Sequence, residues 1–184
     1  RVPVIVHAGT ASTPDAVALS RHALVAGAQA VAVIPPFVYR HSDAGLLRHF
    51  VAVTASVPEL PVYLYNFPAI CNNTLTVELV QQIMEEAPNV VGMKDSSGSL
   101  DALAELVAAT GGRFNAVSGP DGLALMALAL GFAALGLRWR WAALGSQHGC
   151  AGAGISCAGA GMGCAGLQHS RSTVVQFLLV VQFP

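Results

Sequence analysis

Short apolar runs and longer amphipathic segments alternate along the chain up to about residue 131. Apolar runs that end at Gly, Pro or a polar cluster are typical of buried strands, and amphipathic segments between them are typical of helices. The predicted strands are Val2–Val6, Ala30–Ile34, Pro61–Tyr65, Asn89–Met93 and Phe114–Val117. The predicted helices are Thr13–Gly27, Ser42–Val57, Thr76–Glu86, Leu100–Ala109 and Gly122–Leu130.

The first predicted helix carries recognisable signals at both ends. Thr13 suits the N-cap, Pro14 the first helical position and Asp15 the positive end of the helix dipole. Gly27 suits the C-terminal cap because glycine adopts a left-handed backbone without strain.

Five strand–helix pairs with short connections predict parallel βαβ units and an α/β fold. The strands are nearly continuous apolar runs, as expected when both faces of a parallel sheet are covered. Periodicity alone leaves a barrel and an open doubly wound sheet as alternatives. No glycine-rich phosphate-binding motif follows the first strand, so a nucleotide-binding version of the fold is not indicated.

The composition changes after Gly131. All ten acidic residues lie between Asp15 and Asp121, and the part after Gly131 holds only three basic residues, an RWRW run at 138–141 and a Gly/Ala/Cys tract at 149–166. This tract has neither helical nor strand periodicity. We therefore expect a folded domain over residues 1–137, with a further strand near 132–137, and an atypical tail over 138–184. A translated intron, a frameshift or a gene-model error is our hypothesis for this tail.

Charge and composition exclude several classes of partner. The formal net charge is −1, which gives no reason to expect binding to nucleic acid or to an anionic membrane. No apolar run reaches the ~20 residues that span a bilayer, and we find no secretory signal. The four cysteines are Cys71, Cys150, Cys157 and Cys164, and they lack the close pairs of a zinc site. We expect a cytoplasmic protein without a metal ion.

Two residues at predicted strand ends carry candidate chemistry. Lys94, the single lysine of the chain, follows the strand Asn89–Met93. A lysine at the end of an apolar strand is desolvated, which enlarges the share of free amine that attacks a carbonyl. Tyr65 ends the strand before it, and its hydroxyl both donates and accepts protons. A surface lysine and a packed tyrosine are the plain alternatives for each residue taken alone.

The two motifs together resemble those of the dihydrodipicolinate synthase / N-acetylneuraminate lyase family. Tyr65-Asn66-Phe67-Pro68 is similar to its Y-N-x-P motif, and Gly92-Met93-Lys94-Asp95 to its G-x-K-[DE] motif. Segment 42–50 and Ser118-Gly119-Pro120-Asp121 also match in order and spacing.

The resemblance implies a (β/α)8 barrel, of which about five to six βα units are present in this chain. It also implies a Schiff base between Lys94 and pyruvate or a related 2-oxo acid, with Tyr65 as proton relay and Gly119 lining the substrate pocket. Neither a metal nor a cofactor is required by that chemistry. The implied partners are a small 2-oxo acid, an aldehyde, and further copies of the chain in a dimer or tetramer.

Three departures from the family pattern shape the prediction. The chain has no counterpart of the family's carboxylate-binding Gly-Thr-Thr motif, so we expect a truncated chain. The region after Gly131 does not match. Ile70 stands in the substrate-binding loop where dihydrodipicolinate synthases carry an arginine, and Val38 stands where they lend an aromatic residue to a neighbouring subunit.

Ile70 cannot form the two hydrogen bonds that arginine makes to a carboxylate. We therefore expect an aldolase acting on a 2-keto-3-deoxy sugar acid or on 4-hydroxy-2-oxoglutarate. A 4-hydroxy-tetrahydrodipicolinate synthase, a Schiff-base enzyme with another donor, and a catalytically inactive fragment or interaction module are the alternatives.

Overall fold

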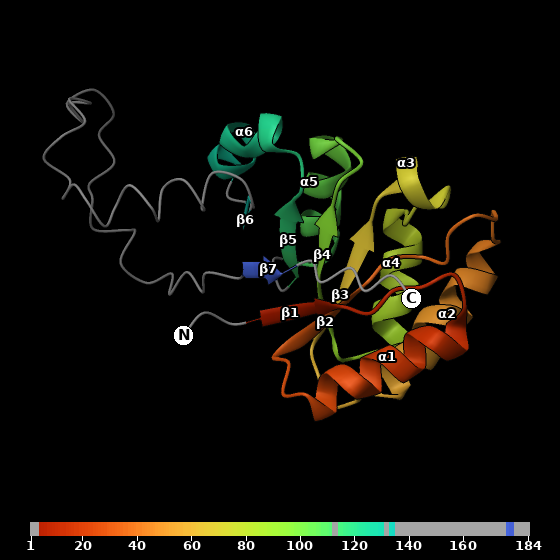
Figure 1. The fold of residues 1–184 in the computed structure, drawn as a ribbon. Coiled ribbons are helices and arrows are strands. Elements are labelled where there is room, and N and C mark those ends of the chain that lie inside the picture. The colour runs from red at the N-terminus through yellow and green to blue at the C-terminus, as the bar shows by residue number, and fades with distance from the viewer. Residues whose placement is uncertain (1–3, 112–113, 131–132, 135–175, 179–184) are drawn as a thin grey trace, which may run out of the picture.

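A single parallel sheet with helices along one face forms the described part of the protein. The computed structural model describes residues 4–111, 114–130, 133–134 and 176–178 (Figure 1). Its strands are β1 (Val4–His7), β2 (Ala30–Val33), β3 (Val62–Asn66), β4 (Val90–Asp95), β5 (Asn115–Ser118), β6 (Ala133–Ala134) and β7 (Gln176–Leu178). Its helices are α1 (Thr13–Val25), α2 (Asp43–Ala55), α3 (Pro68–Cys71), α4 (Val77–Glu86), α5 (Leu100–Ala109), the 3-10 turn η1 (Asp121–Leu123) and α6 (Ala124–Ala129). The strands follow the order β6-β5-β4-β3-β2-β1-β7.

The five predicted strand–helix units are confirmed. Strands β1 to β5 each precede a helix and pair in parallel with their sequence neighbours. This is the arrangement of a partial (β/α)8 barrel. The predicted further strand is present as the two-residue β6. The single-turn helix α3 was not predicted, because four residues are too few to show a helical period.

Polar caps start the helices where the sequence places Ser or Thr. Ser42, Thr76 and Ser99 each accept a hydrogen bond from a backbone N–H of the following first turn. The prediction for the first helix was wrong by one residue. Ser12 is the N-cap and accepts from the backbone N–H of Asp15, whereas the Thr13 hydroxyl pairs with Nδ1 of His49 at 2.8 Å.

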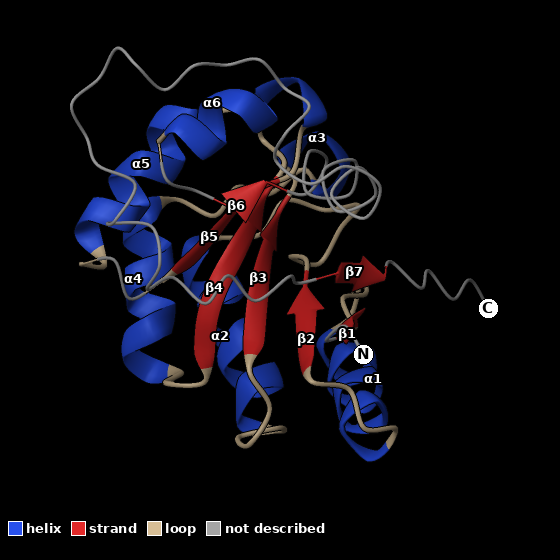
Figure 2. Ribbon diagram, turned by 90° about the vertical axis from the view of Figure 1, so that its left-hand side faces the viewer, coloured by secondary structure: helices blue, strands red, loops and turns tan. Residues whose placement is uncertain are grey.

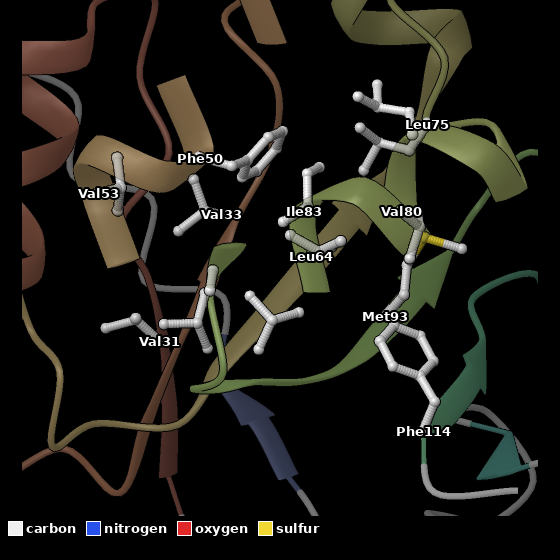
Figure 3. Close-up of a cluster of buried hydrophobic side chains, with 14 of the residues drawn as sticks. Val31, Val33, Phe50, Val53, Leu64, Leu75, Val80, Ile83, Met93 and Phe114 are labelled. Carbon is white, nitrogen blue, oxygen red and sulfur yellow. The ribbon is translucent and has the colours of Figure 1, made fainter. Parts of the chain in front are cut away.

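The main core lies between the sheet and its helices (Figure 2). Side chains of β2, β3 and β4 that point toward the helices pack against apolar side chains of α2 and α4. Figure 3 shows Val33, Leu64 and Met93 of the strands together with Phe50 and Ile83 of the helices. We call this face of the sheet the helix face. Burial of a large aliphatic or aromatic side chain contributes about 1.5–3 kcal/mol, so this cluster fixes the strands that position the site.

The opposite face, which we call the site face, carries the alternate side chains of the same strands. Ile5, Ala30, Ala32 and Tyr63 form a smaller cluster near the start of the strands. Burial raises the pKa of the Tyr63 hydroxyl, and a hydrogen bond with Asn115 opposes that rise.

The edge of β1 pairs in parallel with β7, in the register Ile5↔Phe177. Strand β7 comes from the region that we predicted to be an atypical tail, and the RWRW run and the Gly/Ala/Cys tract lie outside the described residues. The proposed division at 137/138 therefore stays a prediction.

Among the described residues, no helix is both long and apolar enough to cross a bilayer.

Candidate active site

Tyr65 and Lys94 are direct neighbours across the β3–β4 pair. The two residues are register partners, so both side chains leave the sheet on the site face at the carboxyl end of the strands. The Lys94 Nζ lies 4.0 Å from the centroid of the Tyr65 ring, within cation–π distance. Strand β4 continues through Asp95, so Lys94 lies within the strand rather than just after it. The backbone of both strands therefore fixes where this amine and this phenol meet.

Aromatic and apolar side chains surround the buried Tyr65 ring. Ile34 and Cys71 pack against it, and the Phe67 ring lies 5.8 Å away between centroids. Phe67 caps helix α3, whose first residue Pro68 completes the Y-N-x-P motif. The proline and the single helical turn thus wrap the chain after β3 around the tyrosine.

His7, at the end of β1, completes a row of three side chains. Its ring meets the Tyr65 ring edge-on, with centroids 5.8 Å apart and planes at 90°. Strand β2 lies between β1, which carries His7, and β3, which carries Tyr65, and Ala32 is the register partner of His7 on β2. Lys94 and His7 therefore both contact Tyr65.

The His7 imidazole is neutral at physiological pH. Its pKa is lowered to about 4, first by burial and second by the positive charge of Lys94. The sequence motifs above do not single out His7. The signal that identifies it is its place at a strand end, because the carboxyl ends of parallel strands meet at one edge.

Asp95 and Asn66 lock the two strands together directly after the Tyr65–Lys94 pair. Their side chains point to the helix face, where Asn66 Nδ2 donates to Asp95 Oδ1 at 3.2 Å. Asp95 also accepts from the backbone N–H of Ser97 at 2.7 Å and from its hydroxyl at 2.9 Å. Asp95 is only 3% exposed, so its carboxylate is held inside the protein. Asn66 in turn accepts from the backbone N–H of Leu75.

Gly119 lies where the loop after β5 passes close to the end of β4. Its backbone N–H donates to the Asp95 carbonyl at 2.7 Å. A Cβ atom at Gly119 would overlap the hydroxyl of Ser96 and lie 3.0 Å from the Asp95 carbonyl oxygen. A side chain at position 119 would therefore force these neighbours to shift. The role of Gly119 in lining a substrate pocket stays a prediction.

Ile70 and Val38 lie at the same end of the sheet but point outward. Ile70, in α3, is 63% exposed, and Val38, in the loop after β2, is 65% exposed. Val38 has a φ of 83°, which is strained for a β-branched residue. The described contacts do not join either side chain to Lys94 or Tyr65, so a role for Ile70 in substrate binding also stays a prediction.

A comparison with protein families places this geometry among known enzymes. Residues 1–136 match the model of the dihydrodipicolinate synthetase family. The chain belongs to this family. Members of the family are lyases, and the resemblance drawn from the Tyr65 and Lys94 motifs is confirmed.

Individual relatives agree with that assignment. A 4-hydroxy-tetrahydrodipicolinate synthase of Sorangium cellulosum is 42% identical over 131 residues, which are 71% of this chain and 43% of that protein. The solved 4-hydroxy-tetrahydrodipicolinate synthase of Methylacidiphilum fumariolicum SolV has 38% identity and a TM-score of 0.67 over 70% of this chain and 42% of that one. YagE, a family protein from an Escherichia coli K12 prophage solved with pyruvate, has 36% identity and a TM-score of 0.69 over 73% and 46%. The chain spans less than half the length of these relatives.

The described residues give no cluster of three or more His, Cys, Asp or Glu side chains that would hold a metal ion. The polar groups that meet at the strand ends are instead an amine, a phenol and a neutral imidazole. Such a set suits covalent chemistry at a carbonyl with proton transfer.

Proposed function

We propose that Lys94 forms a Schiff base with pyruvate or a related 2-oxo acid, and that Tyr65 transfers protons during this reaction. The observation that carries the proposal is the contact between the Lys94 amine and the Tyr65 ring on paired strand positions. Family membership supports the same reaction class.

The chemistry starts with the uncharged Lys94 amine, which attacks C2 of the 2-oxo acid. A C–N bond forms, the carbonyl oxygen takes up protons and leaves as water, and an imine remains. Loss of a proton from C3 gives an enamine, whose carbon attacks an aldehyde and forms a C–C bond. The aldehyde oxygen then gains a proton and becomes a hydroxyl, and the reverse sequence cleaves the bond. A tyrosine hydroxyl serves these steps because it can both donate and accept a proton.

Two versions of this function differ in the aldehyde that reacts with the enamine. The names of the relatives favour 4-hydroxy-tetrahydrodipicolinate synthase over the sugar-acid aldolase that we expected from the sequence. Ile70 favours the aldolase, because an apolar side chain makes no hydrogen bonds to the carboxylate of an aldehyde. We adopt the synthase as the leading version, since identity over 131 residues outweighs one position.

Borohydride trapping tests the common step. The whole chain is incubated with pyruvate and sodium borohydride, and its mass is measured before and after digestion. We expect one added reduced pyruvyl group on the peptide that contains Lys94. Lys94→Arg keeps the positive charge over Tyr65 and should abolish the adduct. An unmodified chain at saturating pyruvate would contradict the proposal.

A separate measurement tests which aldehyde the enzyme uses. Pyruvate consumption is compared with an amino-acid semialdehyde, which carries a carboxylate, and with glyceraldehyde, which does not. Faster turnover of the semialdehyde supports the synthase, and the opposite order supports the aldolase. Ile70→Arg should shift the preference toward the semialdehyde if this position contacts the aldehyde.

A further inference from the structure

Two histidines hold a buried Nε2 atom that has no hydrogen-bond partner among the described residues. His49 lies between α1 and α2, where its Nδ1 pairs with the Thr13 hydroxyl. It is part of the helix packing. His7 differs, because it stands on the site face at the end of β1, in contact with Tyr65.

The surroundings of His7 keep its Nε2 atom in place at the edge of the site. The edge-on contact with Tyr65 fixes one side of the ring. A Cβ atom at Gly9 would lie 3.1 Å from His7 Nε2 and 2.7 Å from the backbone nitrogen of Ile34. The glycine thus lets the chain after β1 pass close to β2 and to Nε2. The atom lies toward the carboxyl end of the sheet, where Lys94 and Tyr65 also end.

We propose that His7 is a third substrate-binding residue, whose Nε2 atom forms a hydrogen bond with an oxygen of the 2-oxo acid at Lys94. This proposal rests on the proposed function. A buried polar atom without a partner destabilises the protein, and a ligand oxygen removes that cost. On the described site face His7 contacts the same tyrosine ring as Lys94, so the imidazole belongs to the same row of side chains.

The neutral state of His7 suits this role. The pKa of the imidazole is lowered to about 4 by burial and by the Lys94 charge, so one ring nitrogen carries hydrogen and the other accepts at neutral pH. A neutral ring leaves the positive charge of the site on Lys94 or on its imine. His7 therefore orients the substrate, and the proton transfers are left to Tyr65.

Two substitutions separate hydrogen bonding from packing. His7→Gln places an amide near the position of Nε2 but removes the ring, whereas His7→Phe keeps a ring against Tyr65 but removes both nitrogens. We measure the pyruvate concentration that gives half-maximal trapping by borohydride. We expect an increase of about tenfold or more in His7→Phe and of less than about threefold in His7→Gln, since one lost hydrogen bond is worth about a factor of ten. The opposite order assigns His7 to packing and overturns the proposal.

Nuclear magnetic resonance tests the contact without the covalent step. The ¹⁵N signals of the His7 ring, assigned by their loss in His7→Gln, are followed while pyruvate is added to the wild type and to Lys94→Arg. We expect the Nε2 signal to move in both. Trapping at Lys94 with an unmoved His7 signal overturns this inference and leaves the proposed function standing. A moved signal without trapping supports the contact and contradicts the Schiff base, and no response in either measurement contradicts both.

Discussion

The buried carboxylate of Asp95 anchors the end of β4, and its removal tests how the candidate site is held in place. Asp95→Ala leaves the buried side-chain amide of Asn66 without its partner, and it removes the acceptor of the backbone N–H and the hydroxyl of the exposed Ser97. The orphaned Asn66 donor costs about 1–3 kcal/mol and each lost hydrogen bond of Ser97 about 0.5–1.5 kcal/mol, and the loss of a buried charge offsets part of the total. We expect the free energy of unfolding to fall by about 3–4 kcal/mol.

Asp95→Asn provides the matched comparison. The amide oxygen still accepts from Asn66 and Ser97, and the new NH2 group faces the Ser97 hydroxyl, which turns to accept instead of donating. We expect this variant to lose only about 1 kcal/mol, the difference between a charged and a neutral acceptor.

Urea unfolding of the whole chain measures both changes. With a slope of about 1–3 kcal/mol per molar urea, Asp95→Ala should lower the midpoint by about 1–4 M and Asp95→Asn by about 1 M at most. Asp101→Ala, which removes an exposed acid from the first turn of α5, controls for the loss of one negative charge. Equal midpoints for the Asp95→Ala and Asp101→Ala variants would refute the anchoring role.

Three further outcomes follow from the described contacts. Gly119→Ala should cost about 1–3 kcal/mol in urea unfolding, because its new methyl group overlaps a neighbouring serine hydroxyl, whereas Gly122→Ala, with no atom nearby, should change stability by less than about 0.5 kcal/mol. Tyr65→Phe keeps the ring contacts and should leave the urea midpoint nearly unchanged, but it should slow pyruvate trapping by about 10²-fold or more. The lowered pKa of His7 and of His49, each about 4 and caused first by burial, makes the unfolded chain bind protons that the native chain does not. Stability should therefore be full above about pH 6.5 and fall toward pH 4, by up to about 3 kcal/mol for each histidine, and His7→Gln should remove its share.

Each of these outcomes has a result that contradicts it. Equal stabilities of the two glycine variants would show that the loop after β5 moves aside at no cost. A Tyr65→Phe variant trapped at the wild-type rate would remove the hydroxyl from the mechanism. Urea curves at pH 4.5 and 7.5 that coincide for the wild type would show that the buried histidines accept protons in the native state.

The order of elements was predictable because its causes are local. Apolar runs form strands, Ser and Thr cap helices, and proline starts a turn, each within a few residues of chain. The candidates Lys94 and Tyr65 were also accessible from sequence, since parallel strand ends converge at one edge. The choice of Ser12 over Thr13 as the cap was not accessible, because the Thr13 hydroxyl is taken by His49 from a different helix.

The sequence by itself determined the α/β order of the protein, its family and the pairing of one lysine with one tyrosine at neighbouring strand ends. Only the tertiary structure decided which side chains join them. The parallel pairing of β1, β2 and β3 brings His7 to Tyr65. The alternation of side chains along β4 turns Asp95 to the helix face, where Asn66 and Ser97 donate hydrogen bonds to it. The pairing register of the strands and the face to which each side chain points depend on contacts between residues 29 to 58 positions apart. No local sequence pattern encodes such contacts.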